Sequence, residues 1–181
     1  MDTATDTQTK WKIDQSHSEI QFKVKHLVIS TVTGKFTSFD AEAESSEDSF
    51  ENAEVYFEAD VDSVDTGNED RDQHLKSDDF FNAEEHPKLT FRSTSMENTG
   101  ENEYRLTGDL TIRGTTNEIT LDVNHGGTVE DPYGNTKAGF ELSGTLNRKD
   151  YGLQWDAVTE AGNVVVGDKV KLILNVQFIQ G

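Results

Sequence analysis

The chain has 181 residues, enough for one domain with a sizeable core, and carries a formal net charge of −19 with a sequence pI near 4.4. This acidic balance repels phosphate backbones and no local basic patch offsets it, so we expect no nucleic acid partner. There is no cysteine, which excludes disulfides and thiolate chemistry. Because a high charge with low mean hydropathy is also typical of disordered chains, the fold has to be argued from the pattern of residues.

The first ten residues, MDTATDTQTK, are polar and rich in threonine. This composition predicts a disordered tail over residues 1–10, followed by a single domain over residues 11–181. The tail lacks the apolar run of a signal peptide, and no later segment is long and apolar enough for a transmembrane helix. We therefore expect a protein that does not span a membrane and, if the chain is complete, a cytoplasmic one.

From Ser18 onward, apolar residues recur at every second position, which is typical of strands with one buried face. In one weaker segment Phe36 and Phe39 fall on opposite parities, which predicts a bulge or a bend. Short polar connections such as DPYG at 131–134 join the segments and predict an antiparallel meander. The eight predicted strands cover residues 18–26, 34–43, 53–61, 88–95, 104–112, 118–125, 138–146 and 169–179.

Eight strands that are each apolar on one face bury that face by closing into a barrel, which also removes exposed edges. The predicted fold class is therefore all-β, an eight-stranded antiparallel barrel. An eight-stranded barrel is either filled by its own side chains or holds one small ligand. The small inner-face residues Gly108, Ala138 and Gly144 favour a hollow barrel because they leave room, although ordinary core packing explains them equally well.

The stretch RDQHLKSDDFF at 71–81 interrupts the meander, and a capping-box spacing of Thr66 and Glu69 before it predicts a helix over residues 69–81. On that helix Leu75, Phe80 and Phe81 can dock against the barrel, most simply across one open end. The helix is thus predicted to be a short insert near residues 69–81 that covers the barrel.

One stripe of the same helix combines Asp70, His74 and Asp78, a pattern that can ligate a metal or transfer protons. No second histidine stands at metal spacing, and carboxylates are abundant throughout the chain. We therefore predict no metal site and no catalytic residue here.

Several motifs, in order and spacing, resemble those of the YceI-like family of lipid-binding proteins: HSEIQFKVKHL at 17–27, RDQHL at 71–75, HPKLTFRSTS at 86–95 and LTIRG at 110–114. The resemblance runs from about Trp11 to the C-terminus. It implies a lipocalin-like barrel with an elongated apolar cavity for polyisoprenoids, quinones, fatty amides or fatty acids, and no established catalysis. It also implies a periplasmic or secreted protein, which the missing signal segment does not support.

Pattern and resemblance together predict which residues face a bound chain. A polar head group would meet Arg71, His74 or Arg148, although Arg71 and His74 are more readily paired with Asp72 and Asp78. The apolar cavity wall is predicted to contain Phe22, Val24, His26, Phe57, Phe91, Leu110, Phe140, Leu142, Leu174 and Phe178.

The predicted function is the non-enzymatic binding, transport or storage of a long-chain amphiphilic lipid, with no cofactor other than a bound lipid such as a polyprenyl chain or a quinone. Two alternatives remain at this stage. One is a filled acidic barrel that acts as an extracellular interaction module. The other is a lipid-modifying enzyme that uses His74 or His26 as acid or base. A homodimer is also open, with Val164, Val165 and Val166 as a candidate contact.

Overall fold

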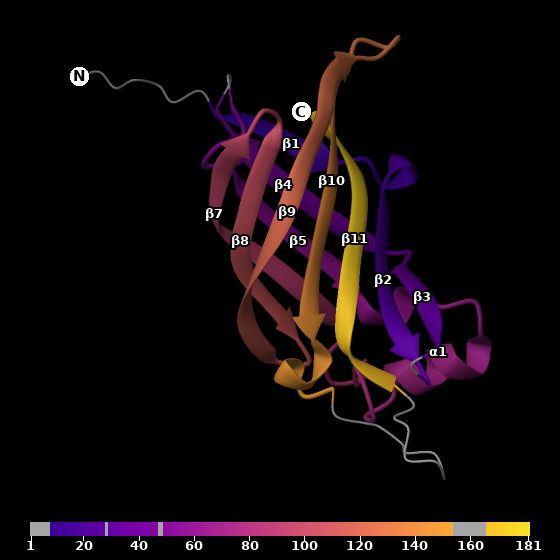
Figure 1. Ribbon diagram of the computed structural model, residues 1–181. Coiled ribbons are helices and arrows are strands. Elements are labelled where there is room, and N and C mark those ends of the chain that lie inside the picture. Colours follow the sequence, from indigo (N-terminus) through magenta and orange to yellow (C-terminus); the bar gives the residue numbers. More distant parts are fainter. Residues whose placement is uncertain (1–7, 28, 47–48, 154–165) are drawn as a thin grey trace.

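The structure, a computed structural model, describes residues 8–27, 29–46, 49–153 and 166–181, and it is built almost entirely of strands (Figure 1). One short helix, α1 (Glu69–Lys76), and three single 3-10 turns accompany them: η1 (Gln15–His17), η2 (Val61–Ser63) and η3 (Arg148–Tyr151). The strands are β1 (Thr9–Ile13), β2 (Glu19–His26), β3 (Ser30–Phe36), β4 (Phe39–Ser45), β5 (Glu54–Asp60), β6 (Val64–Asp65), β7 (Lys88–Gly100), β8 (Glu103–Ile112), β9 (Thr115–Glu130), β10 (Thr136–Asn147) and β11 (Val166–Gln180).

The sheet closes into an antiparallel barrel of eight strands, in the order β1-β4-β5-β7-β8-β9-β10-β11. Closure comes from the pairing of β1 with β11, in which Trp11 lies opposite Gln180 and Ile13 opposite Phe178. Strands β2, β3 and β6 extend the same sheet from the free part of β11 towards α1. The predicted fold class, an eight-stranded antiparallel barrel with one short helical insert, is confirmed.

Three strand interruptions lie side by side and separate β1 from β2, β3 from β4, and β5 from β6. The Gln15 side chain in η1 donates to the Phe39 carbonyl at 2.7 Å, and the Thr37 amide donates to the Ser63 carbonyl at 3.3 Å. The irregularity predicted between Phe36 and Phe39 is therefore a real break, and it lets both rings point inward and be buried.

Strand β1 was missing from the sequence-based prediction, which assigned its first residues to a disordered tail. Thr9 and Lys10 pair with Ser45 and Glu44 of β4. The polar composition hides this strand, because only Trp11 and Ile13 carry its buried face. The remainder of the predicted tail, residues 1–7, lies outside the described residues.

Helix α1 ends at Lys76, so the prediction that it continues to Phe81 was wrong. After Lys76 the chain folds back, and the amides of Phe81 and Ala83 donate to the carbonyls of Leu75 and Lys76 at 2.9 and 2.8 Å. This turn buries Phe80 and Phe81 together, which consecutive positions on a helix do not allow to the same extent.

The predicted capping box was also wrong. The N-cap is Asn68, whose side chain accepts from the Arg71 amide. Thr66 lies two residues before the N-cap and instead donates its amide and its hydroxyl to Asp72 Oδ1, at 2.8 and 2.6 Å. These two bonds link the start of α1 to the end of β6.

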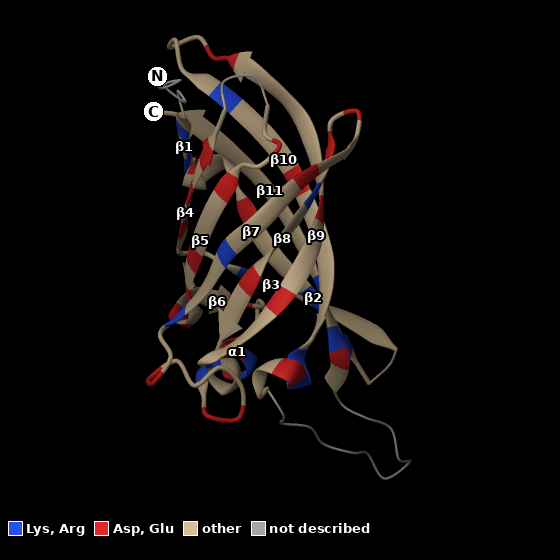
Figure 2. Ribbon diagram, turned by 90° about the vertical axis from the view of Figure 1, so that its left-hand side faces the viewer, with Lys and Arg blue, Asp and Glu red and all other residues tan. Residues whose placement is uncertain are grey.

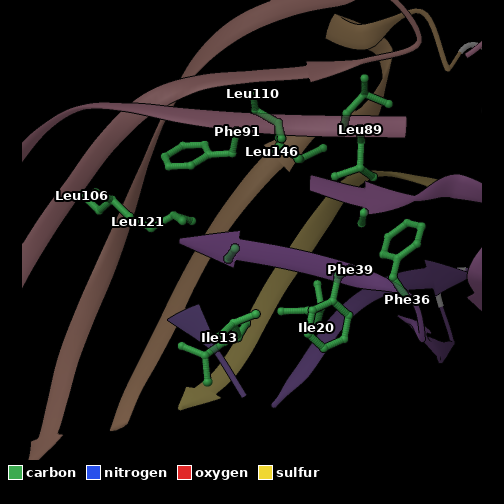
Figure 3. Close-up of a cluster of buried hydrophobic side chains, with 14 of the residues drawn as sticks. Ile13, Ile20, Phe36, Phe39, Leu89, Phe91, Leu106, Leu110, Leu121 and Leu146 are labelled. Atoms are coloured by element: carbon green, nitrogen blue, oxygen red, sulfur yellow. The ribbon is translucent and has the colours of Figure 1, made fainter. Parts of the chain in front are cut away.

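The core lies inside the barrel, where side chains from strands far apart in the sequence face one another (Figure 3). Three inner-face glycines do not leave empty space, contrary to the expectation for Gly108 and Gly144. A Cβ at Gly34 would lie 2.3 Å from the ring of Phe22, one at Gly108 would lie 2.5 Å from that of Phe91, and one at Gly144 would lie 2.5 Å from Leu121. Each glycine thus lets a large neighbouring side chain lie flat against the wall. Ala138 is fully buried.

The candidate dimer contact falls largely outside the described residues, which include only Val166 of the three valines. Val166 begins β11 and lies opposite His26 of β2. The homodimer stays a prediction.

Candidate functional site

A cavity of about 380 Å³ lies within the barrel, in the size range of small-molecule sites. All eight strands of the ring contribute to its wall, and almost every contributed side chain is aliphatic or aromatic. The structure places all ten predicted lining residues on this wall: Phe22, Val24, His26, Phe57, Phe91, Leu110, Phe140, Leu142, Leu174 and Phe178.

Several of these apolar side chains are only half-buried although they point inward. Phe22, Phe57, Phe140, Leu142 and Leu174 all pack against the core yet keep accessible surface. Side chains in a filled barrel would cover one another, because protein interiors are packed as densely as organic crystals. The exposed surface of these residues therefore faces the cavity, and the barrel is hollow.

Aromatic rings fill the end of the cavity opposite α1. The ring centroids of Phe50 lie 5.5 Å from Trp11 and 5.0 Å from Phe140, and the imidazole of His125 stacks on Phe140 at 4.9 Å. Burial lowers the pKa of His125, which favours the neutral ring. This end of the cavity is therefore apolar and carries no charge near neutral pH.

Polar side chains gather at the other end, where α1, the end of β2 and η3 meet (Figure 1). One polar residue of the wall, Gln21, lies away from this end, because it is midway along β2. Lys25 is the only exposed residue on the wall among those the structure describes, so the cavity reaches the surface beside β2. The polar residues at this end are Lys25, His26, Thr66, Arg71, His74 and Arg148.

Among the described residues Arg71 contacts no carboxylate, and its predicted pairing with Asp72 was wrong. Its Nε donates to Thr66 Oγ1 at 2.7 Å and its Nη2 donates to the Thr66 carbonyl at 2.8 Å. Asp72 is already engaged, since it accepts both bonds from Thr66. The guanidinium is thus held in one orientation on the cavity wall.

His74 pairs with a carboxylate, but with a different one from the predicted Asp78. Its Nε2 lies 2.8 Å from Asp79 Oδ2, and its ring meets the edge of Phe80 at 5.1 Å. Asp78 instead pairs with Arg113 of the β8–β9 turn. The fold-back after Lys76 explains the exchange, because it moves Asp78 off the helical stripe that it would share with His74.

Arg148 is 2 % exposed, and its side chain forms hydrogen bonds with the backbone. Its guanidinium donates to the carbonyls of Leu153, Gly167 and Val166 at 2.6, 2.8 and 3.3 Å, and it lies 5.9 Å from the ring of Phe80. It therefore joins the end of β10 to the start of β11 while one face lines the cavity.

The sequence reasoning missed Trp11, Phe50, Lys25 and Thr66 as wall residues. The alternation in TKWKI, with Trp11 and Ile13 on one face, is a strand signal that was available. Phe50 carries no comparable signal, because it stands alone in an acidic connection.

Within the described residues, no three His, Asp or Glu side chains come together in a way that would hold a metal ion. The same part of the chain contains no helix with the length and apolarity needed to cross a bilayer.

The fold and the cavity define the class of the molecule: a hollow antiparallel β-barrel with an apolar interior. The YceI-like domain model matches residues 11–178, and the chain belongs to the YceI-like family. A UPF0312 protein of Staphylococcus epidermidis is 40% identical over 171 residues, which cover 94% of this chain and 97% of that protein.

Two solved structures show the same architecture. The Campylobacter jejuni YCEI protein has a TM-score of 0.76 at 32% identity, over 87% of this chain and 90% of that one. A polyisoprenoid binding domain from Saccharophagus degradans has a TM-score of 0.67 at 16% identity, over 94% of this chain and 98% of the other.

Proposed function

We propose that the protein binds one long-chain hydrophobic ligand inside the barrel and carries or stores it without chemical change. The observation that carries this proposal is the open cavity of about 380 Å³ with its almost wholly apolar wall. A polyisoprenoid, a quinone tail or a fatty chain fits such a wall, and the polyisoprenoid binding domain with the same fold supports this ligand class.

The energetics favour a long chain. Each methylene that moves from water to an apolar wall contributes about 0.8 kcal/mol, so a stretch of about twelve carbons contributes roughly 9 kcal/mol before the costs of association. This driving force depends on length much more than on chemical detail. Tight binding with weak selectivity among chains follows.

Of the two alternatives, a filled barrel is inconsistent with half-buried aromatic rings around an internal cavity. An enzyme that uses His74 or His26 stays a prediction, because the pairing of His74 Nε2 with Asp79 leaves the other imidazole nitrogen for a substrate. The periplasmic or secreted location implied by the family stays a prediction.

Native mass spectrometry of the purified protein, followed by extraction and lipid identification, tests the proposal. We expect a long-chain adduct at a ratio of one per chain. Leu174→Trp, which fills the lumen, should abolish the adduct, whereas Asn175→Trp on the exposed outer side of the same strand should retain it. A bare mass that does not shift with added polyprenols, quinones, fatty amides or fatty acids would contradict the proposal.

A further inference from the structure

We infer that the α1 end of the cavity is a site for an anionic head group, so that the ligand is a long-chain amphiphile ending in a carboxylate or a phosphate. The inference rests on the proposed function, because the head group reaches this site only when its chain occupies the barrel. The inference specifies the head group of the ligand, about which the apolar wall alone gives no information.

The first argument is the distribution of charge between the inside and the outside. The chain has 35 acidic residues against 16 Lys and Arg, and the acidic residues are spread along the strands and over the loops (Figure 2). Within the described residues, however, no Asp or Glu lines the cavity, while Lys25, Arg71 and Arg148 do. The charged side chains described on the wall are therefore all basic, whereas acidic residues outnumber basic ones in the chain as a whole.

The second argument is the state of Arg71. In the described part of the chain its guanidinium forms no ion pair, although carboxylates stand on either side of it in the sequence at Asp70 and Asp72. Its two described bonds, from Nε and Nη2, both go to Thr66, so Nη1 is left for another acceptor. The carboxylate of Asp72 accepts from the same Thr66 hydroxyl, so a negative charge lies near the guanidinium without contacting it. An anionic ligand would give Nη1 a direct charge-assisted hydrogen bond.

The third argument is that the donor is preorganised. Thr66 receives both bonds from Arg71, and Thr66 in turn is held by Asp72 through its amide and its hydroxyl. The planar guanidinium is thus oriented before any ligand binds, which lowers the entropy lost on binding. Charge-assisted bonds from Arg to carboxylate or phosphate are among the strongest hydrogen bonds in proteins.

The fourth argument is the polarity of the cavity along its length. The far end is lined by Trp11, Phe50 and Phe140, with a neutral His125 stacked on Phe140, and it offers nothing to a charge. The exposed Lys25 marks the end that meets solvent. An amphiphile therefore enters tail first and leaves its head beside Arg71. A neutral head such as an amide, an alcohol or a quinone ring would give Nη1 of Arg71 no anionic partner.

Calorimetric titration with four ligands that share one alkyl chain and differ in the head group tests this inference. The heads are carboxylate, phosphate, amide and alcohol, compared at about pH 8, where both acids are charged. We expect the two anions to bind roughly tenfold or more tightly than the neutral ligands. Arg71→Gln should remove this preference by weakening the two anions far more than the alcohol, and Arg71→Lys should keep part of it. Arg105→Gln, on the exposed outer face of β8, is the matched control and should change nothing.

The outcomes separate the inference from the proposed function. If the alcohol binds as tightly as the anions, or if Arg71→Gln keeps the preference, the head-group site is wrong and chain binding still stands. If none of the four ligands binds, the proposed function fails as well. A preference for carboxylate over phosphate, or the reverse, tells which anionic head the site takes.

Discussion

At the scale of single residues, the glycines of the inner face decide how much of the barrel is hollow. Gly34 of β3 lies opposite Phe22 of β2, and the phenyl ring occupies the place of the missing side chain. Because the ring lies against the wall, it does not cross the lumen. The same arrangement recurs at Gly108 beneath Phe91 and at Gly144 beneath Leu121.

Gly34→Ala should therefore reduce the length of chain that the protein holds. The new Cβ would stand 2.3 Å from the Phe22 ring, which has to swing into the cavity at a cost of about 1–3 kcal/mol in stability. The measurement is the chain-length profile of bound lipid by native mass spectrometry. Gly139→Ala, where nothing lies within 4 Å, should keep the wild-type profile, and adding Phe22→Leu to Gly34→Ala should restore it. An unchanged profile in Gly34→Ala would show that the ring does not limit the lumen.

Two buried polar side chains of η3 should respond to removal in opposite ways. Arg148 donates to three backbone carbonyls, so Arg148→Met removes these three hydrogen bonds and should cost about 3 kcal/mol. Tyr151 is 1 % exposed, its hydroxyl has no hydrogen-bond partner among the described residues, and burial raises its pKa to about 12. Tyr151→Phe removes only an unpaired hydroxyl, so it should leave stability within about 0.5 kcal/mol or raise it. The free energy of unfolding of both variants, measured with urea, tests this prediction. Equal losses of stability in the two variants would contradict it.

At the scale of the elements, the breaks in the strands depend on local polar contacts, and Asp14 before η1 has the most of these. Burial disfavours its charged form, but hydrogen bonds with Ser16, His17 and Lys137 outweigh that effect and lower the Asp14 pKa from 3.8 to about 2. Lys137 lies at the start of β10, so Asp14 links the β1–β2 break to the β9–β10 hairpin.

The Asp14 contacts predict a defined loss of stability in acid. Because the folded pKa lies below the unfolded one, the stabilisation is complete above about pH 4 and disappears as the pH falls towards about 2. Asp14→Asn should be less stable than the wild type at about pH 5 and should lose less between about pH 5 and about pH 2. Urea midpoints across this range provide the measurement. Parallel acid profiles of the two proteins would show that Asp14 does not contribute.

At the scale of the whole molecule, the surface charge opposes folding. The net charge is −19, and like charges even face each other across strands, as with Asp40 opposite Glu58 and Glu44 opposite Glu54. Such repulsion destabilises the compact state and weakens as salt screens it. Burial of apolar side chains inside the barrel offsets this charge repulsion, since the core residues come from every strand of the ring.

Salt should therefore stabilise the protein. Raising the ionic strength from about 0.01 M to about 0.15 M shortens the Debye length from about 30 Å to about 8 Å, and the urea midpoint should rise over this range. Sodium and potassium chloride should act equally, because screening does not distinguish the cations. A midpoint that falls with salt would indicate that favourable surface ion pairs, such as Lys88 with Glu58, outweigh the repulsion.

The sequence by itself determined seven of the eight strands of the ring, all but β1, and their inward faces, because alternation along a strand is a local property that each segment carries alone. It also indicated the YceI-like family and the apolar residues that line the cavity. It missed β1, whose two buried residues stand among polar ones, and it extended α1 past Lys76, because the chain reversal there depends on burying Phe80 and Phe81 against the barrel.

Only the tertiary structure decided that the barrel is hollow and which partner each charged side chain takes. The space inside depends on rings such as Phe22 lying over glycines of neighbouring strands, and spacing along one strand says nothing about that. Arg71 stands next to carboxylates in the sequence and yet bonds Thr66, because the turn between β6 and α1 presents Thr66 to it and occupies Asp72. The packing of side chains across strands and the hydrogen-bond partner of each charged residue depend on which residues are neighbours in space. Local patterns in the sequence do not specify these neighbours.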